Sequence, residues 1–344
     1  MENILFLAYT ESDGTLAKGA LEALAAAKQL SGSLTIGLIG AETQAAANSI
    51  ATCGAAKFFA VSGAEFGQAR YGTDAAAAEA ICRAAQASVV ILPANSRTAR
   101  VAPGIAHRLT GRVDTHVTGI STEGGLTVSR WYYRQRMEAV LERKQRPWLM
   151  LLESGCAPAF KGEPGTASVE AVAVAVTEAL KRTSVTGIRA PKSDAQTIRP
   201  DAPLLFVAGA GWTKKQADGQ VHGQEAERLI LGFLKHANAS LGGSKSLVDQ
   251  SGEGQPVLQF MTHLNQVGQT GATPRHPKGL STCCHGEEPH VVGWRFISER
   301  RAVNLDPNCG WARGKADVLY VADAFTVMTR VNALLEEKAE AAGV

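Results

Sequence analysis

The chain has 344 residues, 45% of them hydrophobic and 19% charged, with a formal net charge of +3. That length fits two domains, and the small net charge gives no electrostatic case for binding nucleic acid. No apolar run approaches the ~20 residues of a membrane span, and the six cysteines lack metal-ligand spacing and are typical of reduced cytosolic thiols.

The first half of the chain alternates strand and helix patterns. Continuous apolar runs, typical of strands buried on both faces, cover residues 4–8, 34–39, 57–61 and 88–93. Apolar residues at helical spacing predict helices over residues 15–30, 43–53, 73–87 and 100–109. This alternation predicts a parallel sheet with helices on both faces. Because no basic segment precedes the first strand, we expect no secretory signal and a cytoplasmic protein.

Residues 94–100 form a polar loop between a strand and a helix. Open α/β sheets usually bind ligands at such loops, so Arg97 and Arg100 could contact a nucleotide or a partner. The alternative, which we favour, is a Ser or Thr that caps the helix beside two solvated arginines.

Residues 130–136 read Arg-Trp-Tyr-Tyr-Arg-Gln-Arg and mix aromatic with cationic side chains. Such a mixture suits stacking on nucleic-acid bases, a protein interface, or a half-buried strand whose charges point outward. Because the net charge is small, we favour a strand that contributes to a protein interface.

A second α/β unit follows an exposed linker. Residues 190–202 contain two prolines and several polar residues and predict a linker between a domain of residues 1–189 and one of residues 203–344. An apolar strand over residues 204–208 then runs into Gly209-Ala210-Gly211. Strand, Gly-x-Gly and helix form only a weak dinucleotide-type pattern, because the third glycine is absent.

Chemically informative motifs lie in the last third of the chain. The turn Gln266-Val267-Gly268-Gln269-Thr270-Gly271 has glycines that let backbone N–H groups approach a ligand, and an amide and a hydroxyl that bond polar ring edges. A following segment ends at His290, and a later apolar run ends in Asn-Leu-Asp-Pro at residues 304–307. Asp317 precedes the last apolar run.

These motifs resemble the C-terminal domain of electron-transfer flavoprotein α-subunits. That family carries a Val-Gly-Gln-Thr-Gly turn, a small-residue segment ending in Gln-His, an Ile-Asn-x-Asp-Pro strand end and a late Asp, and the spacings from turn to His and from His to Asn fit without gaps. The N-terminal half is similar more diffusely. The resemblance implies an α/β protein: an N-terminal parallel-sheet domain at the subunit interface, then a flavodoxin-like FAD-binding domain.

The same resemblance implies an FAD site. Its residues would be Ser244, Lys245, Gln266, Val267, Gly268, Gln269, Thr270, Gly271, His285, Gly286, Glu287, Glu288, Pro289, His290, Asn304 and Asp317. Lys245 would lie beside the isoalloxazine ring, with Thr270 near its redox nitrogen and His290 at its pyrimidine edge. Asn304 and Asp317 would hold the adenosine half.

Several positions depart from the family pattern. Ala210 stands where the family has an Arg that contacts the flavin nucleotide, and Lys245 stands where it has an Arg. His285 replaces a serine, Pro289 replaces a glutamine, and the glutamates at 287–288 replace apolar residues and would disfavour an anionic flavin. These departures leave open a flavin-poor scaffold subunit of the same fold.

The run Cys283-Cys284-His285, with His290 beyond it, also invites a metal interpretation. Adjacent cysteines rarely chelate one ion well, and no second pair lies nearby in the sequence. We therefore expect no metal.

The resemblance implies an electron carrier rather than an enzyme. It would pair with an electron-transfer flavoprotein β-subunit, which could hold AMP. It would accept electrons from a flavin-linked dehydrogenase and pass them to a quinone-linked or other acceptor, without nucleic acid or a membrane span. A non-redox nucleotide-binding module that uses the loop of residues 94–100 remains the other alternative.

Overall fold

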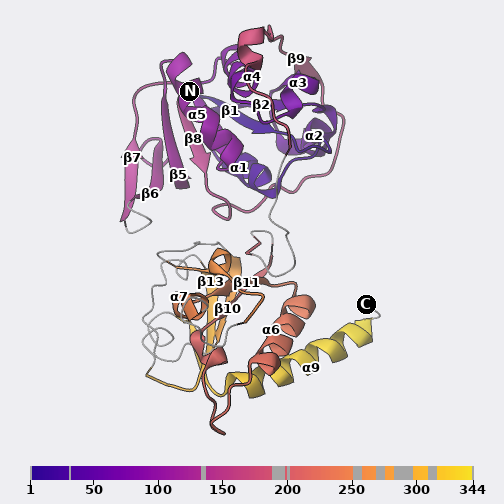
Figure 1. The fold of residues 1–344 in the computed structure, drawn as a ribbon. Coiled ribbons are helices and arrows are strands. Elements are labelled where there is room, and N and C mark those ends of the chain that lie inside the picture. The colour runs from indigo at the N-terminus through magenta and orange to yellow at the C-terminus, as the bar shows by residue number, and fades with distance from the viewer. Residues whose placement is uncertain are drawn as a thin grey trace. The chain divides into compact units, whose positions relative to one another are not determined.

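The computed structural model describes residues 2–30, 32–132, 137–187, 198–199, 202–250, 258–268, 276–282, 297–308 and 316–342. They belong to two compact units, Met1–Arg189 and Ala190–Val344, each with its own sheet (Figure 1). Most of the expected linker, residues 190–202, lies outside the described residues, which include only 198–199 and 202 of it.

The N-terminal unit is built on a nine-stranded sheet of order β7-β6-β5-β8-β4-β1-β2-β3-β9. Its strands are β1 (Glu2–Tyr9), β2 (Gly32–Gly40), β3 (Lys57–Ser62), β4 (Val89–Pro93), β5 (Arg112–Ser121), β6 (Thr127–Tyr132), β7 (Met137–Glu142), β8 (Trp148–Leu152) and β9 (Val169–Ala171). The pairs β5–β6 and β6–β7 are antiparallel, and the other pairs among the described strands are parallel.

Helices cover both faces of this sheet (Figure 1). They are α1 (Lys18–Lys28), α2 (Gln44–Ser49), α3 (Ala64–Gly67), α4 (Tyr71–Ala84) and α5 (Ser96–Arg108), with the 3-10 turns η1 (Ala51–Cys53) and η2 (Glu178–Lys181). Helices α1 and α2 pack on the face that carries Phe6, and α3, α4 and α5 on the face that carries Leu7. Successive residues of β1 are therefore both buried, which explains its continuous apolar run and confirms the expected α/β class.

Helix α5 begins earlier than its apolar spacing indicates, because Asn95 caps it. The Asn95 side chain accepts from the Thr98 N–H at 2.9 Å, and the Thr98 hydroxyl accepts from the Asn95 N–H at 3.1 Å. This capping box starts the helix at Ser96, four residues before the start expected from the sequence. The cap is thus an Asn and not the Ser or Thr that we favoured.

The antiparallel extension β5–β7 is held by one buried carboxylate. Asp114 accepts from the Trp148 indole at 2.9 Å, from Arg130 at 2.9 Å and from Arg143 at 3.0 Å. The strand expected over residues 130–136 belongs to this extension as far as Tyr132, and residues 133–136 lie outside the described chain.

The C-terminal unit has a five-stranded sheet of order β11-β10-β12-β13-β14, with parallel pairing throughout its described strands. The strands are β10 (Leu204–Ala208), β11 (Ser240–Gly243), β12 (His276–Thr282), β13 (Ile297–Asn304) and β14 (Val318–Val321). In chain order this arrangement is 2-1-3-4-5, the flavodoxin-like order. It confirms the fold class expected for this half.

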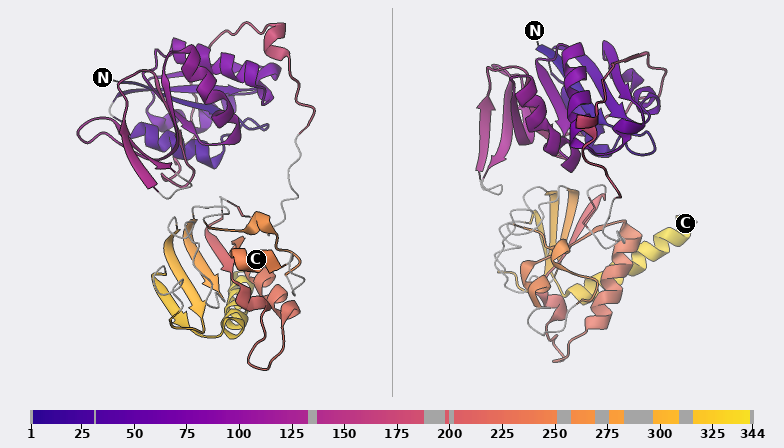
Figure 2. Two further views of the ribbon diagram at one scale, coloured as in Figure 1. Left: turned by 60° about the vertical axis from the view of Figure 1, so that its left-hand side comes forward. Right: turned by 45° about the horizontal axis from the view of Figure 1, so that its top comes forward.

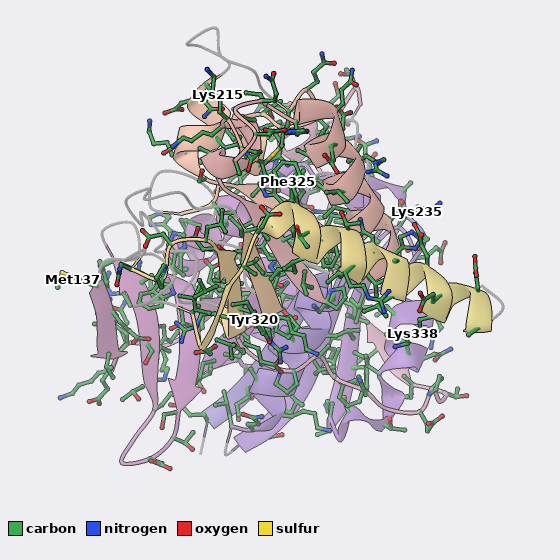
Figure 3. The ribbon with its side chains drawn as sticks, turned by 90° about the horizontal axis from the view of Figure 1, so that it is seen from below. Met137, Lys215, Lys235, Tyr320, Phe325 and Lys338 are labelled. Atoms are coloured by element: carbon green, nitrogen blue, oxygen red, sulfur yellow. The ribbon has the colours of Figure 1, made fainter. Side chains whose placement is uncertain are left out.

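Two long helices, α6 (Gly223–Ala237) and α9 (Ala324–Ala342), lie against one face of this sheet and against each other (Figure 2). Figure 3 shows Phe325 in the first turn of α9 and Lys338 toward its other end. The shorter elements are η3 (Ala210–Thr213), α7 (Lys245–Asp249) and η5 (His263–Asn265). Val207 and Ala302 are buried on the opposite face, with Val267 packed against them.

Candidate functional site

The carboxyl ends of the strands in the C-terminal sheet bring together several of the expected site residues. The chain leaves β10 toward β11 on one side and later returns to β12 on the other, so the strand order reverses between β10 and β12. Ligands of open α/β sheets bind outside the carboxyl ends of the strands at such a reversal. Here the Gly209 N–H donates to the Thr282 carbonyl at 2.9 Å and joins the two strand ends.

Ser244 and Lys245 follow β11 at this edge. The Ser244 N–H donates to the Ala208 carbonyl at 2.9 Å, and the Ser244 hydroxyl accepts from the Leu247 N–H at 3.2 Å. Ser244 is therefore the cap of α7, and Lys245 is its first residue. The Lys245 ammonium is half exposed and donates to the carboxylate of Asp249, one helical turn later.

Asp249 has a second basic partner that sequence reasoning missed. His263 Nε2 lies 2.9 Å from Asp249 Oδ1. The hydrogen bond from Lys245, and then that from His263, lowers the pKa of the Asp249 carboxyl from its usual value. His263 lies three residues before the Gln266 turn, and no pattern in the sequence connects it to Asp249.

The described part of the glycine turn lies beside β11. The Val267 N–H donates to the Gly243 carbonyl at 3.0 Å, and Gln266 pairs with Gly243 as an isolated parallel bridge. Gly268 has a φ of 115°, in the region that favours glycine, so the backbone needs a residue without Cβ at this position. Gln269, Thr270 and Gly271 lie outside the described residues.

The segment His285, Gly286, Glu287, Glu288, Pro289 and His290 also lies outside the described residues, as do Cys283 and Cys284. Among the residues that the structure does describe, no group of three His, Cys, Asp or Glu side chains could hold a metal ion. The expectation that Cys283, Cys284 and the histidines beyond them bind no metal is therefore not tested.

The Gly-Ala-Gly turn after β10 is closed by an indole. Trp212 is fully buried, donates its Nε1–H to the Thr282 hydroxyl at 2.8 Å, and packs on Phe325 with ring centroids 4.6 Å apart. Ala210, which stands where the related family has an arginine, is also buried, in the same turn η3. Trp212 thus continues the hydrophobic core into this turn.

Asn304 and Asp317 lie at opposite ends of neighbouring strands. Asn304 ends β13, is buried, and donates from Nδ2 to the Asp306 carbonyl at 3.3 Å. Asp317 precedes β14 at the amino edge of the sheet, where Arg300 binds its carboxylate at 2.7 Å and lowers its pKa. The structure therefore does not bring Asp317 to the other expected residues.

Asp323, and not Asp317, lies at the carboxyl edge of the sheet, where the acidic residue of the expected site would be. It follows β14 at the carboxyl edge, next to the end of β13, and its Oδ2 accepts from the N–H and the hydroxyl of Thr326, both at 2.8 Å. The sequence identifies Asp323 as the cap of the last helix. Its position at the carboxyl edge follows from the strand register, in which Asn304 of β13 pairs with Val321 of β14. The sequence alone does not show this register.

The polar loop of the N-terminal unit is engaged in the fold. The Arg97 guanidinium binds the buried carboxylate of Asp74 at 2.7 and 2.9 Å and lies 4.2 Å from the centroid of the Tyr9 ring. Arg100 donates to the Ala69 carbonyl at 2.8 Å and is half exposed. Of the two arginines expected to be solvated, only Arg100 is exposed, and it too reaches the Asp74 carboxylate, at 3.4 Å.

Comparison with known families identifies the N-terminal unit. The model of the electron transfer flavoprotein domain matches residues 4–179, just over half of the 344 residues. The chain belongs to the electron transfer flavoprotein family. Proteins of this family are electron carriers rather than enzymes. No curated protein matches the chain, and no helix among its described residues is long and apolar enough to cross a membrane.

The described side chains at the carboxyl edge fit a flavin nucleotide in kind. Lys245 supplies a cation, Gln266 and Asn304 supply amides, and Asp323 supplies an acceptor for ribose hydroxyls. The Ser281 hydroxyl near the end of β12 is buried and has no hydrogen-bond partner within the described chain. A buried hydroxyl without a partner is costly, so it is consistent with a polar group that completes this site.

Proposed function

We propose that this chain is the FAD-binding α-subunit of a heterodimeric electron transfer flavoprotein. The observation that carries the proposal is the parallel sheet of 2-1-3-4-5 order. Its carboxyl edge gathers Ser244, Lys245, the start of the Gln266 turn, and Asn304. The family match to residues 4–179 supports the same assignment from the other unit.

In this proposal the flavin, when bound, supplies the redox chemistry by taking electrons from one partner and giving them to another. Lys245 places positive charge beside the ring, which favours negative charge there. The turn from Gln266 to Gly271 and the segment from His285 to His290 bind the ring through backbone and polar side-chain groups. Asn304 and Asp323 hold the adenosine half, and Asp323 takes the role that the sequence assigned to Asp317.

The partners follow from the family. A β-subunit completes the carrier and could hold AMP, a flavin-linked dehydrogenase donates the electrons, and a quinone-linked or other acceptor receives them. Arg130 stacks 4.3 Å from the Tyr132 ring at the end of β6, and Met137 of β7 is more than half exposed. We assign this part of the antiparallel extension to the contact with the β-subunit.

A flavin-poor scaffold subunit is the second candidate. Two observations favour it: Ala210 lies buried where a nucleotide-binding arginine is expected, and Asp249 already binds Lys245. For a non-redox nucleotide module, in contrast, the principal cation of the loop, Arg97, is already bound to Asp74.

The deciding experiment is an absorption spectrum of the chain purified with its β-subunit, followed by titration with dithionite. We expect bands of bound flavin that bleach on reduction. A colourless, stable complex that cannot be reconstituted with FAD would contradict the carrier assignment and leave the scaffold.

A further inference from the structure

Three ionisable side chains form a connected cluster at the end of β11. Lys245 Nζ donates to Oδ2 of Asp249, and His263 Nε2 lies 2.9 Å from Oδ1 of the same carboxylate. Each oxygen of Asp249 thus serves one basic partner. Lys245 and His263 are 49% and 64% exposed, so both are accessible to a ligand.

The backbone fixes this arrangement from both sides. Lys245 and Asp249 lie on α7, whose cap Ser244 is bound to the end of β10. On the other side, His263 begins η5, where Thr262 and Asn265 form a capping box. The buried Asn265 side chain donates to the Leu241 carbonyl of β11 at 3.4 Å. Asp249 is therefore held between its two partners by the fold.

Of the three side chains in the cluster, His263 is the one whose protonation changes the net charge near neutral pH. The charges of Lys245 and Asp249 cancel, and histidine is the side chain that ordinarily changes charge between about pH 5 and 8. Helix α7 and β11 carry no other ionisable groups, and η3 carries none. Two exposed lysines follow η3, Lys214 and Lys215, the second of which is labelled in Figure 3. Within the described chain, protonation of His263 therefore converts a neutral cluster to one of charge +1.

We propose that His263 is a positioning residue that, through Asp249, controls how much of the positive charge of Lys245 acts on the flavin. This inference rests on the proposed function, because Lys245 is assigned to the ring. With neutral His263, Asp249 offsets the Lys245 charge. With charged His263, the carboxylate is shared and the excess positive charge favours reduced flavin over oxidised flavin.

The first test needs no flavin. The carboxyl carbon of Asp249 is followed by NMR in the full chain between about pH 5.5 and 8, the range in which histidine ordinarily titrates. We expect its resonance to move in wild type and to stay constant in His263→Asn, because Asn keeps a donor but carries no charge. A wild-type resonance that stays constant over this range overturns the coupling.

The second test uses the FAD-loaded complex with the β-subunit. The ratio of the dissociation constants of oxidised and reduced flavin is obtained from the reduction potential at both ends of the pH range. At the acidic end we expect His263→Asn to lower the preference for reduced flavin severalfold, and at the alkaline end to leave it unchanged. The matched control is His236→Asn, since His236 pairs with Glu336 at 3.4 Å at the far end of α6.

The outcomes separate this inference from the proposed function. If wild-type complex binds FAD and His263→Asn reproduces its pH profile, the role of His263 is overturned and the carrier stands. If Lys245→Met abolishes the effect of the His263 substitution, the route through Lys245 is supported, because coupled residues give non-additive effects. If wild-type complex binds no FAD, the proposed function and this role fall together.

Discussion

Asp114 shows how a single residue holds a part of the fold that local sequence signals do not predict. Burial raises the pKa of its carboxyl, but hydrogen bonds from Arg143, Trp148 and Arg130 outweigh burial and bring it below its usual value. A carboxyl whose pKa is lowered on folding stabilises the protein above its unfolded pKa, about 3.9, and loses that contribution as the pH falls.

We therefore expect Asp114→Asn to lower the free energy of unfolding at pH 7 by about 3–5 kcal/mol, because it leaves two partly buried arginines without their counter-charge. The difference from wild type should shrink as the pH falls from about 4 through the lowered pKa of the folded carboxyl, below which the wild-type side chain is also neutral. Urea unfolding at a series of pH values measures it. The exposed Glu123→Gln is the control, and a pH-independent difference contradicts the ionic account.

Arg97 offers a second test at the same scale. Its guanidinium is 15% exposed and bidentate to Asp74, which is fully buried. Removal of the Arg97 guanidinium leaves the buried carboxylate with only the longer contact to the half-exposed Arg100, 3.4 Å away. Arg97→Met should therefore lower the free energy of unfolding by about 3 kcal/mol, the low end of the range for breaking a buried ion pair. The control Arg83→Met breaks an exposed pair with Glu79 one helical turn away and should cost about 0.5 kcal/mol or less. Equal losses in the two variants, measured by urea unfolding, would show that Arg97 is not a structural residue.

At the scale of elements, the sequence predicts most accurately the parts that are buried on both sides. Strands β1 to β4 and β10 were expected within a few residues, because two covered faces require continuous apolar runs. The long β5 was not, because only Asp114 and Val117 of its residues are buried, three positions apart, so the alternation of a half-buried strand is missing. Its pairing also shifts at a bulge between these two residues. His116, in that bulge, has a φ of 57° that no local pattern predicts.

The candidate site follows the same division. The spacing of Ser244, the Gln266 turn and Asn304 was readable, and the structure places their described parts at one edge of the sheet. The sequence analysis selected Asp317, but Asp323 is the acidic residue at this edge. Distinguishing the two requires the direction and register of β13 and β14, which the sequence does not show. His263 joins the cluster through a tertiary contact alone.

Turn η3 gives a prediction at the element scale. Trp212 both fills the core beside Phe325 and donates to Thr282. Trp212→Phe keeps most of the packing and removes the N–H donor to the buried Thr282 hydroxyl, which still donates to the Val207 carbonyl at 3.3 Å. We therefore expect a loss of about 0.5–1.5 kcal/mol, the net contribution of one hydrogen bond. Trp212→Ala should cost about 3–5 kcal/mol. Thermal unfolding ranks the two variants, and equal losses would show that the hydrogen bond, not the packing, dominates.

The two edges of the C-terminal sheet give a prediction for ligand binding. Asp323→Asn keeps a capping oxygen for α9 but removes the charge that accepts from ribose hydroxyls, so we expect FAD affinity to fall roughly tenfold, the loss of about 1.4 kcal/mol. Asp317→Asn, at the amino edge, should leave the affinity unchanged. Fluorescence titration of the complex with FAD measures both, and the reverse order would restore Asp317 to the site.

At the scale of the whole molecule, each unit has its own sheet and its own buried core, so ligand binding can be assigned to one or the other. The carrier proposal assigns FAD to residues 190–344, whereas a nucleotide module would use the loop after β4. In the N-terminal unit Arg97 is bidentate to Asp74, and the half-exposed Arg100 reaches the same carboxylate at 3.4 Å, so both arginines of that loop already have partners. We therefore expect a chain truncated to residues 1–189 to bind neither FAD nor AMP in calorimetry, while the full chain with its β-subunit binds FAD. Binding of AMP or ATP by the truncated chain would instead favour the nucleotide module, and its circular dichroism spectrum establishes that it is folded in either case.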